Sequence, residues 1–310
     1  KTHLRDYLRV SDGLYVTEQW VMQKIVRNER VFDAAYYRTV LQIVRNVLDE
    51  PEFKGKLLAL AVPNGHENHY TCGYLVSSDA TRTFRETFEA AIEYAAGESK
   101  RGYEIIAEEF VAGGTECSVE SLSYRGMHRV IQVTEKISSG PPHCVELGHI
   151  QPARISEENR RLAEMAVPSL LTALGYDNGP CHTEVKLVDG KVYLIEVNAR
   201  PGGDFITWPL VSLSTGYDLL KGAIGVALDR FSFPAADGFR PSHAGVCFVT
   251  EQTRALEPLF RECQNRPWCH WKNDVGPVSE MRHNNCDGTN CFIWKSEQGM
   301  PAEIREALSC

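Results

Sequence analysis

The most informative segment of the chain reads Ile195-Glu196-Val197-Asn198-Ala199-Arg200-Pro201-Gly202-Gly203-Asp204. Glu196 and Asn198 are two residues apart on an apolar strand, so their side chains point to the same face. Carboxylate and amide oxygens are ligands that Mg²⁺ accepts, usually together with substrate phosphates. Arg200 has the same parity, and its fork of donors suits a transferring phosphoryl group or a developing oxyanion. The segment therefore predicts a strand that ends in a metal and phosphoryl site.

A hairpin places a third carboxylate beside this segment. Strands at 181–188 and 191–198 flank the turn Asp189-Gly190, and Glu184 lies on the first of them. A regular two-residue turn would pair Val188 with Lys191 and set Glu184 opposite Ile195, on the wrong face. A three-residue loop or a β-bulge would instead set Glu184 opposite Glu196. A shared metal site therefore predicts an odd loop or a bulge in this hairpin.

On both sides of this hairpin, the spacing of apolar residues predicts an α+β chain. Upstream, apolar residues at helical spacing predict helices over 17–50, and a further helix starts at Asp79 or Thr81 and ends at Gly97. Three short apolar runs predict strands at 56–62, 73–76 and 103–107.

Downstream, strands at 116–123 and 129–136 are expected to form an antiparallel meander. Ser156 caps a helix that runs to about Leu174, and Pro168 should kink or divide it. The remaining elements are expected to be a helix near 216–228, a strand at 244–250 and a helix near 254–264.

Composition excludes several classes of protein. The net charge is −8 without a basic stripe, which argues against nucleic acid as a partner. Apolar runs fall short of the roughly 18 residues of a membrane span, so no membrane association is expected. The ten cysteines include no CxxC pair. Cys117, Cys144 and Cys247 lie in apolar, strand-like runs and are interpreted as small core residues. We expect a cytoplasmic, reducing location, and the helices of 17–50 could mediate a homodimer.

Four motifs together resemble the ATP-grasp superfamily. They are EVNARPGGD (196–204), HTEVK (182–186), EEFV (108–111) and EKISSGPPHCVELGHIQPARI (135–155). Within the superfamily, the last of them resembles the L-amino-acid ligases and carnosine-synthase-like enzymes. The resemblance covers residues 100–245 well, 52–99 loosely and 1–50 hardly at all. It implies an ATP-grasp fold, in which two α+β sub-domains clasp a nucleotide.

The resemblance also implies site residues. Glu108, Glu109, Phe110 and Val111 would form the hinge that contacts adenine, Glu116 would bond the ribose, and Lys136 would either face phosphate or lie exposed at a strand end. Glu184, Glu196 and Asn198 would hold Mg²⁺, or Mn²⁺ in its place, and Arg200 would stabilise the acyl phosphate and the tetrahedral intermediate. Glu146 and His149, in a Gly-Pro loop, would bind an amino-acid substrate together with Gly203 and Asp204.

Two departures from the family pattern are visible. Val62 stands where the family carries a phosphate-gripping lysine, and the loop 66–72 lacks the usual glycines. We also expect this chain to lack the N-terminal domain that normally precedes an ATP-grasp part. We therefore predict a helical lead segment (1–51), a small sub-domain (52–111), a large sub-domain with the metal and substrate site (112–237) and a small C-terminal α+β segment (238–310).

The leading hypothesis is an ATP-dependent carboxylate–amine ligase that forms an amide bond through an acyl phosphate and acts on small amino-acid, carboxylate and amine substrates. One alternative is an ATP-dependent carboxylase on the same fold, against which the Glu146 and His149 loop argues. The other is a degenerate ATP-grasp module without turnover. Val62 favours the degenerate module, whereas the joint presence of Glu184, Glu196, Asn198 and Arg200 favours the enzyme.

Overall fold

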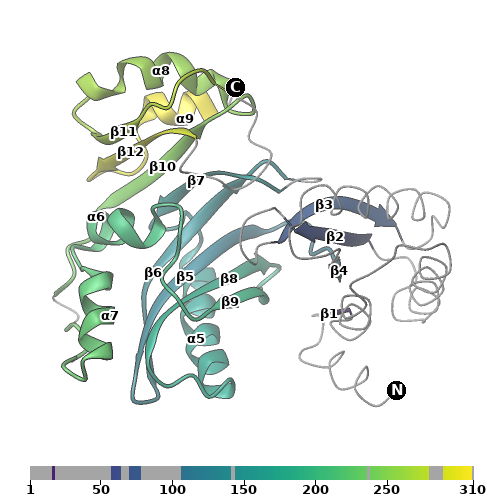
Figure 1. The fold of residues 1–310 in the computed structure, drawn as a ribbon, viewed down its shortest axis with the longest axis vertical. Helices are drawn as coiled ribbons and strands as arrows, with labels where there is room; N and C mark the ends of the chain where they lie inside the picture. Colours follow the sequence, from purple (N-terminus) through teal and green to yellow (C-terminus); the bar gives the residue numbers. More distant parts are fainter. Residues whose placement is uncertain are drawn as a thin grey trace, which may run out of the picture. The chain divides into compact units, whose positions relative to one another are not determined.

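The computed structural model describes residues 110–140, 144–235, 238–278 and 289–308 in full, and four further strands by their backbone. The chain divides into two compact units (Figure 1). The first contains residues 1–112 and 139–145, and the second contains residues 113–138 and 146–310. The predicted helices over 17–50 and from Asp79 or Thr81 to Gly97 lie outside the described residues.

The first unit contains a four-stranded sheet in the order β1-β4-β2-β3, with antiparallel pairing throughout. Its strands are β1 (Val16–Thr17), β2 (Leu57–Pro63), β3 (Tyr70–Ser77) and β4 (Ile106–Glu109). The strands expected at 56–62 and 73–76 are confirmed. Of the strand expected at 103–107, the described part begins at Ile106 and continues through Glu109, so half of the expected adenine hinge is strand.

The second unit contains an eight-stranded antiparallel sheet in the order β11-β12-β10-β7-β6-β5-β8-β9 (Figure 1). The strands are β5 (Thr115–Tyr124), β6 (Met127–Ser138), β7 (Glu146–Gln151), β8 (Gly179–Val188), β9 (Lys191–Asn198), β10 (His243–Val249), β11 (Cys269–Asn273) and β12 (Asn290–Ser296). The expected meander and hairpin are confirmed. Strands β10 to β12 extend the sheet that carries the hairpin, and the division of the chain into four parts stays a prediction.

The helices of the second unit are short apart from one. They are α5 (Glu157–Ala173), the π-helical η1 (Ile206–Val211), α6 (Ser212–Thr215), α7 (Leu219–Ala227), η3 (Arg254–Leu256), α8 (Glu257–Glu262), η4 (Cys263–Asn265) and α9 (Ala302–Leu308). No helix among the described residues is long and apolar enough to cross a membrane.

Helix α5 begins and ends where the sequence predicts. The Ser156 hydroxyl caps it by accepting from the Asn159 amide, and Gly175 follows it in a left-handed conformation. Pro168 does not divide the helix, which is continuous from Glu157 to Ala173. Val167 and Leu171, on either side of the proline, are buried against the sheet, and we attribute the continuity of the helix to this packing.

The alternation of strand residues separates an apolar face of the sheet from a polar one. On β5, Cys117 and Val119 join the core beneath α5, and Glu116, Ser118 and Glu120 point to the opposite face. Burying one side chain such as Leu171 in this core contributes about 1.5–3 kcal/mol. Much of the polar face is buried as well, although Glu196 on β9 is exposed, and this face carries the candidate site.

Candidate functional site

The hairpin of β8 and β9 contains the predicted bulge. Asp189 and Gly190 form a two-residue turn with positive φ at both positions, and Val188 pairs with Lys191. The register then shifts by one residue, so that Val185 pairs with Leu194 but Glu184 pairs with Glu196. Ile195 is the extra residue on β9. The bulge therefore sets the two carboxylates directly opposite each other, as a shared metal site requires.

Asn198 extends this pair of carboxylates. It lies opposite His182, two residues beyond Glu196 on β9 and therefore on the same face. Within the described part of the chain, its side-chain Nδ2 is buried without a hydrogen-bond partner. Rotation by half a turn exchanges the amide nitrogen and oxygen, so this position can present an oxygen to a ligand. Two carboxylates and an amide on one face are a donor set that fits Mg²⁺.

Lys136 on β6 joins the carboxylates of this face. Its Nζ lies 2.8 Å from Glu184 Oε2 and 3.6 Å from Glu116 Oε1, and it forms a close ion pair with Glu146. Burial alone would lower the pKa of Lys136, but the three carboxylates raise it well above its usual value. Of the two expected placements for Lys136, exposure at the strand end is wrong, because its side chain is only 2% exposed.

The ionisation of the carboxylates follows from these contacts. Burial opposes the charged form of Glu184, yet Lys136 and His182 lower its pKa to about 2. In the same way, Lys136 and His149 hold the pKa of Glu146 well below its usual value against the effect of burial. At Glu116 burial dominates and raises the pKa. Glu184 and Glu146 are therefore anionic at neutral pH.

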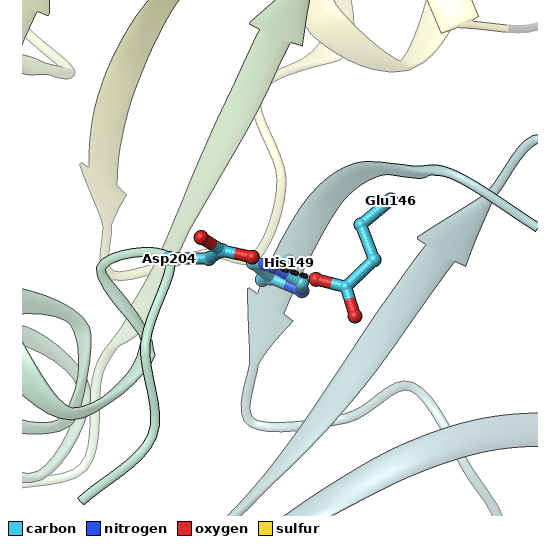
Figure 2. Close-up of side chains that lie close together, drawn as sticks. All are labelled: Glu146, His149 and Asp204. Carbon is cyan, nitrogen blue, oxygen red and sulfur yellow. Dashed lines mark ion pairs between the residues drawn. The ribbon is translucent and has the colours of Figure 1, made fainter. Parts of the chain in front are cut away.

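Glu146 and His149 lie on strand β7 rather than in a loop, which corrects the expectation from sequence. His149 is fully buried, with its Nε2 3.0 Å from Glu146 Oε2. Its Nδ1 has no hydrogen-bond partner among the residues that the structure describes. Asp204 enters from the segment after β9, and the ligand atoms of the three residues lie within 4.8 Å of one another (Figure 2). Two carboxylates and an imidazole at these distances could hold a cationic group.

Other predicted residues have simpler surroundings. Arg200 is half-buried and its Nη1 donates to the Pro201 carbonyl at 2.9 Å. Gly203 is exposed. In the first unit, Glu108 and Glu109 pair through their backbone with Ala59 and Leu58 of β2. Their side chains lie outside the described residues, and Phe110 and Val111 are half-buried.

The sequence analysis assigned no role to Glu120, which is buried on the polar face. Its Oε1 contacts His182, and its Oε2 accepts from the Gly202 amide and the Thr207 hydroxyl. One signal could have found it, because Glu120 has the same strand parity as Glu116.

Comparison with known proteins identifies the fold that holds this site. Residues 75–208 match the family model of the ATP-grasp domain. This chain carries an ATP-grasp domain. The D-alanine–D-alanine ligase of Flavobacterium psychrophilum is 32% identical over 123 residues, which make up 38% of this chain and 36% of the ligase. The match thus spans about a third of the length of that curated relative.

Solved structures support the ATP-grasp fold over most of the chain. The L-amino acid ligase from Bacillus licheniformis is similar with a TM-score of 0.57 and 22% identity, covering 93% of this chain and 70% of that one. The biotin carboxylase domain of the Hydrogenobacter thermophilus 2-oxoglutarate carboxylase, solved with MgADP and bicarbonate, gives a TM-score of 0.54 at 14% identity. It covers 89% of this chain and 60% of that one. At these identities the likeness concerns the fold.

The polar cluster lies inside the matched ATP-grasp region, from Glu116 to Asp204. Carboxyl groups outnumber basic groups on this face. The carboxyl groups are Glu116, Glu120, Glu146, Glu184, Glu196 and Asp204, and the basic groups are Lys136, His149, His182, Lys186 and Arg200. Carboxylates that lie close together and partly buried favour the binding of a cation, because the cation offsets repulsion that solvent screens only weakly.

Proposed function

We propose that this chain is an ATP-dependent carboxylate–amine ligase that acts on an amino-acid substrate through an acyl phosphate. The bulge in the β8–β9 hairpin is the observation that carries the proposal, because it sets Glu184 opposite Glu196 with Asn198 one same-face position away. These three residues would hold Mg²⁺, which neutralises charge on the phosphates of ATP when it is bound.

The first step is phosphoryl transfer. An oxygen of the substrate carboxylate attacks the γ-phosphorus of ATP, the bond to the β-phosphate oxygen breaks, and ADP leaves. Lys136 lies beside Glu184 on the buried face, where it can contact a phosphate oxygen. In this proposal the adenine lies against the backbone of Glu108 to Val111, and Glu116 bonds the ribose.

The second step forms the amide bond. The amine nitrogen attacks the acyl carbon, a C–N bond forms, phosphate leaves, and the nitrogen loses a proton. Arg200 stabilises the oxyanion of the tetrahedral intermediate. In this proposal His149 orients a carboxylate or accepts a proton, and its Nδ1, which has no hydrogen-bond partner within the described part of the chain, supports this role.

The cluster of Glu146, His149 and Asp204 supports an amino acid as a substrate. Glu146 remains ionised despite its burial, and an ionised carboxylate binds an ammonium group by charge-assisted hydrogen bonds. The same carboxylates would repel bicarbonate, the substrate of the carboxylase alternative. The backbone of Gly203 would complete this subsite.

Calorimetry of ATP binding with and without Mg²⁺, followed by phosphate release with a panel of amino-acid pairs, tests the proposal. We expect Mg²⁺-dependent binding and phosphate release with at least one pair. Glu196→Gln should weaken the Mg²⁺-dependent part of binding, and an unchanged Mg²⁺ dependence in this variant would remove Glu196 from the metal site.

The non-catalytic alternative makes a different prediction in the same experiment. It rests on Val62, which lies in β2 where the family carries a lysine. A complete absence of nucleotide binding by the wild-type chain would support it and would contradict the ligase.

A further inference from the structure

A histidine lies behind the proposed metal ligand Glu184. His182 and Glu184 are two residues apart on β8 and share a face. The His182 Nε2 lies 3.1 Å from Glu184 Oε1, and its Nδ1 forms a close hydrogen bond with Glu120 Oε1 on the neighbouring strand. Both ring nitrogens face carboxylate oxygens, so both donate, and the ring is an imidazolium.

Glu120 anchors this histidine from the other side. It pairs in register with His182 across β5 and β8, and it is only 1% exposed. Its second oxygen accepts from the Gly202 amide at 3.2 Å and from the Thr207 hydroxyl at 2.9 Å. Three groups, the Gly202 amide, the Thr207 hydroxyl and the Glu184 carboxylate, therefore converge on this buried carboxylate and its histidine.

The segment after β9 approaches this pair closely. A Cβ atom on Gly202 would lie 2.6 Å from His182 Nδ1 and 2.8 Å from Glu120 Oε1, so there is no room for a side chain. Gly202 is thus required where the backbone that follows Arg200 passes over the pair.

Stability alone does not explain such a pair. Removing charged groups from water costs several kcal/mol each, and apolar residues of similar volume are often as stabilising as a buried ion pair. Glu120 and His182 are 1% and 3% exposed, yet they lie on the polar face rather than in the core beneath α5.

We infer that His182, anchored by Glu120, is a positioning residue that fixes the Glu184 carboxylate for metal binding. The inference rests on the proposed function, which assigns Glu184 to the metal. A carboxylate has about four acceptor positions. His182 and Lys136 take one position on each oxygen of Glu184, which fixes its plane and leaves positions for a cation.

Two substitutions distinguish the hydrogen bond of His182 to Glu120 from its hydrogen bond to Glu184. His182→Asn keeps a donor near the position of Nδ1, toward Glu120, and removes the donor to Glu184. His182→Gln keeps a donor near the position of Nε2, toward Glu184. The measurement is calorimetric ADP binding across a Mg²⁺ titration, with ADP in EDTA as the metal-free reference and the melting temperature as a check on folding.

We expect His182→Asn to raise the Mg²⁺ concentration needed for ADP binding by about 10–100-fold, as loss of a group that orients a metal ligand typically does. Binding in EDTA should be unchanged, and His182→Gln should restore most of the Mg²⁺ dependence. His128→Asn is the matched control. His128 is on the same sheet, bonds Ser123 and contacts none of the proposed ligands, so its variant should behave as wild type.

Two outcomes would overturn the inference. Wild-type Mg²⁺ dependence in His182→Asn would show that Glu184 needs no such support. Equal losses in His182→Asn and His182→Gln, with equal falls in melting temperature, would show a structural role only. Glu196→Gln, measured in parallel, distinguishes an error in the proposed metal site from an error in the role of His182. If it also leaves Mg²⁺ dependence unchanged, the metal site itself is misassigned, whereas a loss in Glu196→Gln alone contradicts only the role of His182.

Discussion

Arg200 follows the proposed metal ligands Glu196 and Asn198, and its environment leaves it available for chemistry. It is half-buried, and its side chain donates a hydrogen bond to the neighbouring Pro201 carbonyl. A guanidinium held by a backbone carbonyl keeps its charge unneutralised. It can therefore stabilise an oxyanion that develops beside it.

Replacing Arg200 by alanine should lower turnover by about 10²–10³-fold, the usual loss when a group that stabilises an oxyanion is removed. Nucleotide affinity should change little, because Arg200 acts after ATP has bound. Phosphate-release kinetics and calorimetry measure the two effects. Arg161→Ala, on the exposed side of α5, is the control. Equal losses in turnover and affinity would contradict the proposed role.

The cysteines offer a prediction that depends on pH. Burial raises the pKa of the Cys117 and Cys247 thiols to about 12. Each thiol therefore stays protonated when folded and ionises above pH 9 only when the chain unfolds. The corresponding stability is present below pH 9 and is lost as pH rises from 9 toward 12.

We expect iodoacetamide at pH 8 to label partly exposed Cys269 well before Cys117 and Cys247, which should react only after denaturation. Mass spectrometry of the labelled peptides measures the order. Early labelling of Cys117 in the folded protein would contradict its burial. Cys144, expected in the core with these two, is only partly buried and lies outside the strands.

At the scale of the element, the β8–β9 hairpin depends on one surplus residue. Deleting Ile195 would remove the bulge but leave Glu196 opposite Glu184. Deleting Val197 is different, because Glu196 and Asn198 would become adjacent on β9. Their side chains would then point to opposite faces of the sheet, whether or not the bulge remains. We expect the deletion of Ile195 to retain Mg²⁺-dependent ADP binding and the deletion of Val197 to abolish it. Calorimetry on both variants checks this, and equal behaviour would contradict the register.

Local patterns in the sequence were sufficient to predict this hairpin, since parity and the Asp-Gly turn together required a bulge. They failed at β7, where Gly148 and Pro152 indicated a loop. A Cβ on Gly148 would lie 2.6 Å from the Val246 carbonyl, so this glycine marks a close approach of strand β10 rather than a turn. Strand β10 is nearly a hundred residues away, and no local pattern reveals which strand will lie alongside.

The same reason explains the placement of Lys136 and Glu120. Their burial depends on which strands become neighbours, with Glu146 and His182 contributed by β7 and β8. The sequence analysis identified the residue types and their faces. The network that joins Lys136 to three carboxylates requires the full strand order of the sheet.

For the whole molecule, we expect the stability to depend on bound cations. The chain has a net charge of −8, and several of its carboxylates gather on one face of the eight-stranded sheet. A ligand that binds the folded state stabilises it by about 2.7 kcal/mol at a concentration of 100 times its Kd. For a chain of this size, that corresponds to a rise in Tm of several degrees.

Differential scanning fluorimetry should therefore show a rise in Tm with ADP and Mg²⁺ together that exceeds the sum of the rises with ADP in EDTA and with Mg²⁺ alone. Coupled binding of metal and nucleotide produces this excess. Additive shifts would contradict a site in which the metal bridges protein and phosphate.

The bulge has a second consequence, for the solubility of the protein. Strand β9 forms one edge of the eight-stranded sheet, and an unbroken edge strand offers backbone groups to the strands of other molecules. Ile195, the surplus residue, is 44% exposed and interrupts the regular spacing of that edge. The irregularity that aligns two carboxylates on one face thus also guards the protein against aggregation through its open edge.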